Sequence, residues 1–221
     1  DYQKEGVRWM ATLAHHGFGA CLADDMGLGK TLQALMVLRM RQHLGPALVV
    51  VPKSVVTNWQ EEVTRFAPEL EVVVFENPAE RETLIQEAKA GQIILVNYGM
   101  LGSLAQSLKS RRWASMVLDE AQQIKNAGTQ RAKLLFQLEG DFRLALSGTP
   151  IENHLGELWS LFTFINPGLL GSLGEFKRRF GKAVKDPQHM ALLRAVISPF
   201  ILRRLKQQVL TELPDKTEII H

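Results

Sequence analysis

The stretch at 23–31 constrains the fold of this chain more than any other. Its two glycines, Gly27 and Gly29, lie between a short apolar segment at 20–23 and an apolar-faced segment at about 30–43. Glycine has no side chain and tolerates positive φ, so backbone N–H groups of such a loop can turn toward an anion. The positive end of the following helix strengthens that site. The order of strand, glycine-rich loop, Lys-Thr and helix predicts a phosphate-binding P-loop.

The side chains of this loop define the expected nucleotide contacts. Lys30 would reach the β- and γ-phosphates, and the Thr31 hydroxyl would be a ligand of Mg²⁺. The strict P-loop pattern requires a glycine where this chain has Asp24, so the loop alone leaves a plain strand-to-helix turn open. The residues expected to line the nucleotide site are Asp25, Met26, Gly27, Leu28, Gly29, Lys30 and Thr31.

Two later apolar segments also end in polar residues. Residues 115–119 predict a buried strand that presents Asp119 at its carboxyl end, and Glu120 follows directly. With a P-loop upstream, Asp119 is expected to hold Mg²⁺, and Glu120 to orient and deprotonate an attacking water. Residues 143–147 end at Ser147, and Gly-Thr-Pro follows, which by itself would indicate only a turn.

Short apolar segments alternate with helical patterns along residues 1–150. The expected strands are continuously apolar, which is typical of parallel strands buried on both faces: 20–23, 47–51, 72–75, 93–96, 115–119 and 143–147. The expected helices cover about 2–15, 30–43, 54–66, 79–90, 99–108 and 128–138. This alternation predicts an α/β domain with a mostly parallel sheet, helices on both faces, and a ligand site at the carboxyl ends of the strands.

The strand pattern stops after Pro150. Residues 154–211 indicate a mainly helical structure, interrupted by glycines and prolines. We therefore expect an α/β lobe at 1–150 and, at 151–221, a helical appendage with a return segment.

Composition excludes some classes of protein. Hydrophobic residues make up 46% of the 221 positions and charged residues 22%, which is ordinary for a globular protein. No apolar run approaches the roughly 18 residues of a membrane span, so no membrane partner is expected. The single cysteine, Cys21, can form no internal disulfide and falls in an expected buried strand. Together with the absence of a signal-peptide pattern, this predicts an intracellular protein.

Basic residues concentrate in the last third of the chain. Residues 151–221 supply the whole net charge of +3, and between Lys177 and Lys206 nine Lys and Arg residues accompany one acid. Such a stripe can follow a nucleic-acid backbone, although a solvated helical face or a domain contact would have the same composition. The stripe begins with Lys177, Arg178 and Arg179, which we take as candidate DNA contacts.

Polar residues after two other strands are further candidates. Lys53 and Ser54 lie at an expected helix N-terminus, where amides and a hydroxyl can bind a phosphate or simply cap the helix. Asn97 and Tyr98 follow the strand at 93–96 and are candidate backbone contacts. Trp59 is expected in the core rather than as a base-stacking platform.

Taken together, these motifs resemble those of the Swi/Snf family of DNA-dependent ATPases in helicase superfamily two. The similar stretches occur in family order: Tyr2 to Met10 (adenine-recognition element), Asp24 to Thr31 (the loop D-[DE]-M-G-L-G-K-T), Val51 to Trp59 (motif Ia), Val96 to Tyr98 (Ib), Asp119 to Gln122 with Ile124-Lys125-Asn126 (II), Ser147 to Asn153 (III), and Phe200 to Lys216 (the end of the first lobe). Asp24 is normal in this family. Gln122 replaces a histidine common in eukaryotic members.

The resemblance implies a fold, a reaction and partners. It implies the first of two RecA-like lobes, with ATP and Mg²⁺ bound between them and duplex DNA as the track of a translocating motor. Gln3 would recognise adenine through its amide, and Gln122, Ser147 and Thr149 would couple the nucleotide state to DNA contacts. The arginine that completes catalysis would come from the second lobe, so the isolated lobe should hydrolyse ATP very slowly.

Two alternatives stay open at this stage. One is an RNA or single-strand helicase of the same superfamily, and the other is a non-catalytic, nucleotide-gated DNA-binding module. The compartment would be the cytoplasm or nucleoid of a prokaryote, weakly favoured by Gln122, or the nucleus of a eukaryote.

Overall fold

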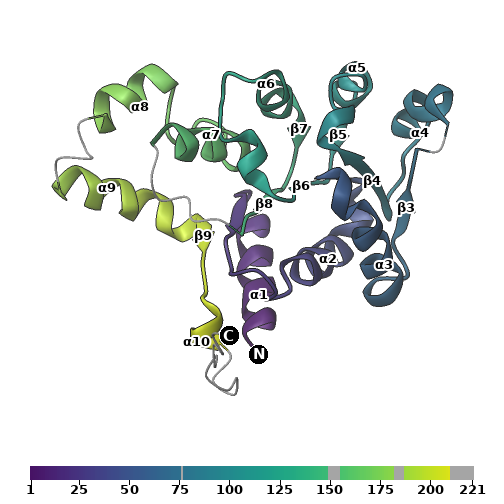
Figure 1. Cartoon of the computed structure of the whole chain (residues 1–221), viewed down its shortest axis with the longest axis horizontal. Helices are drawn as coiled ribbons and strands as arrows, with labels where there is room; N and C mark the ends of the chain where they lie inside the picture. The colour runs from purple at the N-terminus through teal and green to yellow at the C-terminus, as the bar shows by residue number, and fades with distance from the viewer. Residues whose placement is uncertain (76, 149–154, 182–186, 210–221) are drawn as a thin grey trace, which may run out of the picture.

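A parallel β-sheet forms the centre of the molecule (Figure 1). The computed structural model describes residues 1–75, 77–148, 155–181 and 187–209. The strand order is β3-β4-β2-β6-β8-β1-β9, and every pairing is parallel. The strands are β1 (Ala20–Leu22), β2 (Ala47–Val51), β3 (Glu71–Val73), β4 (Gln92–Asn97), β6 (Ser115–Leu118), β8 (Arg143–Leu146) and β9 (Ile201–Leu202). A separate parallel pair joins β5 (Arg112–Trp113) to β7 (Glu139–Gly140).

Helices cover both faces of the sheet, which confirms the predicted fold class. On one face lie α1 (Tyr2–His15), α2 (Lys30–Arg41) and α3 (Val56–Phe66) (Figure 1). On the other face lie α4 (Arg81–Gln86), α5 (Ala105–Lys109), α6 (Gln130–Gln137) and α7 (Leu155–Ile165). Successive residues of one strand therefore enter different cores: Val49 packs with α2 and α3, whereas Val50 packs with the opposite helices.

All six expected strands are present, with ends shifted by a few residues at most. The expectation that no strand follows Pro150 was wrong, because Ile201 and Leu202 form β9 beside β1. Two apolar residues are too few to show a strand periodicity. Only their partner on β1, 180 residues earlier in the chain, makes them a strand.

The helices after β8 begin within the lobe and then leave it. Phe162 and Phe164 of α7 are fully buried, and α7 packs against β8. From there α8 (Leu173–Phe180) and α9 (Pro187–Ile197) project to the side of the sheet before the chain returns to β9 (Figure 1). The return is fixed by Phe200, whose ring lies 6.3 Å from that of Phe162.

Two further findings concern the sequence expectations. Cys21 is fully buried in β1, and burial raises the pKa of its thiol to about 12, so it is a core residue, as expected. Trp59 is also a core residue, with 1% of its surface exposed. Within the described ranges, none of the helices combines the length and the apolar character needed to cross a membrane.

Candidate nucleotide-binding site

The glycine-rich loop connects β1 to α2 in the way the sequence predicts. Gly27 and Gly29 both have positive φ, 83° and 71°, and Gly29 is the N-cap of α2. Residues with a Cβ rarely adopt this conformation, so these two positions favour glycine. Leu28 between them is fully buried, which anchors the loop to the lobe.

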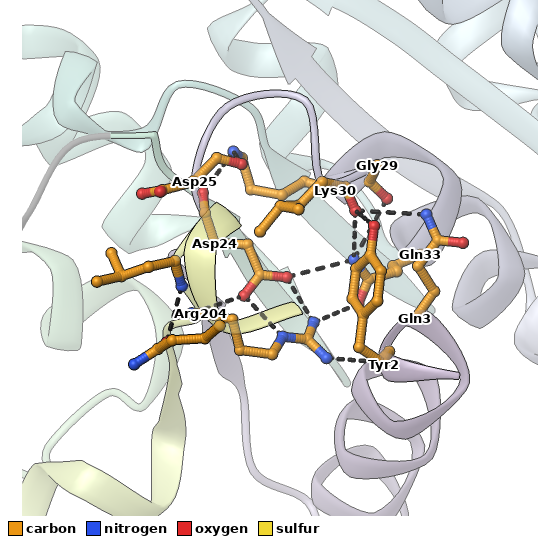
Figure 2. Close-up of polar contacts among 11 residues, drawn as sticks. Tyr2, Gln3, Asp24, Asp25, Gly29, Lys30, Gln33 and Arg204 are labelled. Carbon is orange, nitrogen blue, oxygen red and sulfur yellow. Dashed lines mark hydrogen bonds and ion pairs between the residues drawn. The ribbon is translucent and has the colours of Figure 1, made fainter. Parts of the chain in front are cut away.

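Lys30 lies across the mouth of this loop. Its Nζ donates to the carbonyl oxygens of Asp24, at 2.7 Å, and Asp25, at 3.2 Å (Figure 2). Burial lowers the pKa of Lys30, and the surrounding carboxylates oppose that shift, Glu120 most strongly. The ammonium group therefore shares one electrostatic environment with both acids that follow β6.

Asp119 is held by hydrogen bonds on both carboxylate oxygens. The indole Nε1 of Trp59 donates to Oδ2 at 2.8 Å, and the amide of Glu120 donates to Oδ1 at 2.9 Å. Burial raises the pKa of Asp119, while these two bonds act in the opposite direction. The sequence placed Trp59 in the core but missed this contact, since a predicted buried tryptophan does not reveal which acceptor its N–H finds.

Glu120 has an unusual backbone conformation. It is the one described non-glycine residue with positive φ, at φ 50° and ψ 55°. Such backbone strain is typical of functional positions. The turn directs the Glu120 carboxylate to the amide Nε2 of Gln122, 2.5 Å away.

Gln122 joins the ends of two strands. Its Oε1 accepts a bond of 3.4 Å from the hydroxyl of Ser147, the residue after β8. A polar chain thus runs from Glu120 through Gln122 to Ser147. Thr149, the third expected coupling residue, lies outside the described residues.

The first turn of α1 also contacts the loop. The Tyr2 hydroxyl and the Gln3 amide both donate to the carbonyl of Leu28, at 3.2 and 3.4 Å (Figure 2). A Cβ at Gly29 would clash with Nε2 of Gln3. A side chain at position 29 would therefore displace the Gln3 amide from the loop.

The candidate DNA contacts fall into two groups. Lys53 and Ser54 are exposed after β2, and Asn97 ends the neighbouring strand, where its side chain accepts a bond from the Gly99 amide. Tyr98 is mostly buried, and its hydroxyl donates to the carbonyl of Asp119 at 2.8 Å. The structure thus ties Tyr98 to the acid strand, and its contact with DNA stays a prediction.

The second group lies on the projecting helices. Lys177, Arg178 and Arg179 are exposed in the last turn of α8. Figure 1 shows α8 at the opposite end of the molecule from α3, the helix that follows Lys53 and Ser54 in the chain.

The chain is similar to known proteins in sequence and in structure. Residues 2–221 match the family described as the SNF2-related domain. The chain belongs to this family. It is 41% identical over 228 residues to YwqA of Bacillus subtilis (98% of this chain, 25% of that protein) and 39% identical over 242 residues to the chromatin-remodeling ATPase INO80 of Drosophila melanogaster (99% and 15%). It thus spans about a quarter or less of these relatives.

A solved structure extends the similarity to three dimensions. The Sulfolobus solfataricus SWI2/SNF2 ATPase core in complex with dsDNA superposes with a TM-score of 0.88 at 44% identity, over 97% of this chain and 46% of that one. The match confirms the RecA-like fold and the family resemblance found in the motifs.

The Trp59 contact generates a test of the acid site. Replacing Trp59 with Phe keeps the apolar ring and removes the N–H donor that lowers the pKa of Asp119. Loss of a bond to a charged acceptor should raise this pKa further. On acidification the carboxylate form would then be lost at a higher pH than in the wild type. A carbon-13 NMR titration of the Asp119 carboxyl group measures the midpoint directly.

Trp113→Phe is the matched control. Trp113 is equally buried, but its N–H donates to the carbonyl of Leu108 rather than to Asp119. Its replacement should leave the midpoint of Asp119 unchanged. An unchanged midpoint in the Trp59 variant would contradict the assigned role.

Proposed function

We propose that this chain is the first ATP-binding lobe of a motor that hydrolyses ATP and translocates on duplex DNA. The observation that carries the proposal is the parallel pairing of β8 with both β1 and β6, which brings Lys30 of the loop near Glu120 and Asp119 at one edge of the sheet. A module that only bound nucleotide or DNA would need a phosphate-binding loop, but not a neighbouring pair of acids with a strained backbone between them.

The residues at this edge fit ATP and Mg²⁺. The loop Asp25–Gly29, with Met26 and Leu28, and the ammonium of Lys30 would hold the phosphates. Gln3, whose amide contacts the Leu28 carbonyl of the loop, would recognise adenine. Thr31 and Asp119 would hold Mg²⁺, because hydroxyl and carboxylate oxygens are the ligands this ion prefers. The bound ion would neutralise charge on the phosphate oxygens.

Glu120 is the candidate general base for hydrolysis. Its carboxylate would take a proton from a water whose oxygen forms a bond to the γ-phosphorus as the bond to the β–γ bridging oxygen breaks. The products are ADP and inorganic phosphate. The hydrogen bond from Gln122 fixes the orientation of this carboxylate. A second lobe of the complete protein would close the site and supply the remaining positive charge.

The chain from Glu120 to Ser147 suggests how hydrolysis reaches the DNA surfaces. Loss of the γ-phosphate would change the charge beside Glu120, and Gln122 would transmit that change to Ser147. Thr149 is the third coupling residue of the proposal. DNA would contact Lys53, Ser54, Asn97 and Tyr98 on the lobe, and Lys177, Arg178 and Arg179 on α8. The similar Sulfolobus ATPase core forms a complex with dsDNA, which supports duplex DNA as the partner of this chain too.

ATP hydrolysis by the complete protein tests this proposal. We expect duplex DNA to stimulate steady-state hydrolysis strongly, and single-stranded DNA or RNA to stimulate it weakly. Stimulation by RNA or single strands alone would favour a helicase of the same superfamily. Absence of turnover with every nucleic acid would favour a nucleotide-gated binding module.

Replacing Glu120 with Gln separates binding from chemistry. The glutamine oxygen can still accept the bond from Gln122, but the amide cannot take a proton. We expect kcat to fall by about 10²–10⁴-fold, the usual contribution of a general base, with ATP affinity within a few-fold of wild type. Glu82→Gln, at an exposed site on α4, should leave both unchanged. Normal turnover by the Glu120 variant would exclude this residue as the base.

The basic residues of α8 can be tested by salt dependence. Each phosphate contact contributes about 0.9 to the slope of log K against log salt for duplex DNA. If all three residues contact phosphates, a triple change to Gln should reduce the slope by about 2.7. The measurement is a DNA-binding titration of the complete protein at several salt concentrations.

A variant with the same loss of charge elsewhere provides the control. Its three exposed positions lie on the lobe, outside both candidate DNA groups: Arg65, Lys89 and Lys109. This variant should lose less than one unit of slope. Equal losses in both variants would show that net charge alone, rather than α8, sets the affinity.

A further inference from the structure

Residues 201–206, which return from the projecting helices, run beside β1 and the start of the phosphate loop. In addition to the pairing of β1 with β9, three hydrogen bonds connect this segment to residues 23–25. The Ala23 amide donates to the Leu202 carbonyl at 2.7 Å, the Asp25 amide to the Arg204 carbonyl at 3.0 Å, and the Lys206 amide to Oδ2 of Asp25 at 3.0 Å. The loop therefore contacts residues that lie about 180 positions later in the chain.

Arg204 supplies the central contact of this segment. Its Nε and Nη2 donate to the two carboxylate oxygens of Asp24, at 3.0 and 2.5 Å, and its own amide donates to Oδ1 at 3.1 Å (Figure 2). The Asp24 side chain is fully buried, and 12% of the Arg204 side chain is exposed. This pair explains why a buried carboxylate occupies the position where the strict P-loop pattern has glycine.

The same guanidinium reaches both neighbours of the loop. Nη2 donates to Oε1 of Gln33 on α2 at 2.9 Å, and Nη1 donates to the carbonyl of Tyr2 on α1. Gln33 in turn donates to the carbonyls of Leu28 and Gly29, at 3.3 and 3.4 Å. One side chain thus connects the beginning of the loop, the helix after it and the adenine-recognition element.

The energetics favour a positioning role over a simple gain in stability. A buried ion pair contributes little net stability, because both charges lose their hydration, whereas removal of one partner leaves an uncompensated charge. What the pair does provide is geometry, since the planar guanidinium binds a carboxylate through two parallel bonds. A lysine carries the same charge but cannot form this pattern.

We propose that Arg204 is a positioning residue of the nucleotide site, and that docking of residues 201–206 and binding of ATP to the loop strengthen each other. This inference rests on the proposed function, because it concerns the same loop. Asp24 lies at the start of the loop, so its bonds with Arg204 hold the loop backbone in place relative to residues 201–206. Coupling between two binding events is reciprocal. ATP binding therefore tightens the contact of residues 201–206 with β1 and the loop.

Nucleotide binding by the complete protein provides the first test. In Arg204→Lys, we expect the Kd for a fluorescent ATP analogue and the KM for ATP to rise about tenfold, as for loss of one charge-assisted bond. We expect kcat at saturating ATP to stay within threefold, because Glu120 is untouched. The matched control is Arg41→Lys at the far end of α2, where Arg41 binds Ser115 and the Ala114 carbonyl. Its Kd should stay within twofold.

These measurements distinguish the two proposals. A wild-type protein that binds no ATP would overturn both of them. A wild type that binds ATP, together with an Arg204 variant of unchanged Kd, would overturn the positioning role alone. Equal changes in Kd for the Arg204 and Arg41 variants would also overturn it, since they would indicate a general loss of structure.

A double-mutant cycle tests the route through Asp24. Asp24→Asn should also raise the Kd, and the combination with Arg204→Lys should be no worse than the more damaging single change. Additive effects would show that Arg204 does not act through Asp24.

Hydrogen exchange keeps the proposal testable if the Arg204 variant fails to fold. In the wild type, saturating nucleotide should slow exchange of the Ala23 and Asp25 amides, which bond to the returning segment. Unchanged exchange at both amides would overturn the proposed linkage.

Discussion

Parallel pairing of the strands is the constraint on which the rest of this structure depends. Leu22 of β1 pairs with Leu146 of β8, and Leu118 of β6 pairs with Ala145. Because all strands run in one direction, the residues that follow them emerge at the same edge of the sheet. This register, and no local feature of the motifs, brings the glycine-rich loop, the two acids and Ser147 into one site.

Concentrating these groups at one buried edge has an electrostatic cost, which specific contacts offset. Burial disfavours the charged forms of both Asp119 and Lys30, and it shifts their pKa values in opposite directions. Trp59 stabilises the carboxylate of Asp119, and the carboxylates around Lys30 stabilise its ammonium. The Asp24 side chain is fully buried, and Arg204 binds both of its carboxylate oxygens. These contacts hold polar and charged side chains together at one edge of the sheet, an arrangement suited to a charged ligand.

The returning segment shows how distant parts of the chain complete the loop. Both the first turn of α1 and residues 201–206 contact the loop. The projecting helices α8 and α9 lie between β8 and β9 in the chain, so the segment that carries Arg204 follows directly after them.

The local chemistry of the chain could be predicted from its residues alone. Continuous apolar segments predicted six of the sheet strands, and the positive φ of Gly27 and Gly29 followed from the loop pattern. The burial of Cys21 was also predictable, because its neighbours in the chain are apolar, and Trp59 lies at helical spacing from Val56 and Val63. Contacts between residues far apart in the chain, by contrast, became visible only in the folded molecule. The strand character of Ile201 and Leu202, the bond from Trp59 to Asp119 and the pairing of Arg204 with Asp24 depend on which segments become neighbours. The sequence pattern indicates which residues are buried, but it does not show which distant residues they contact.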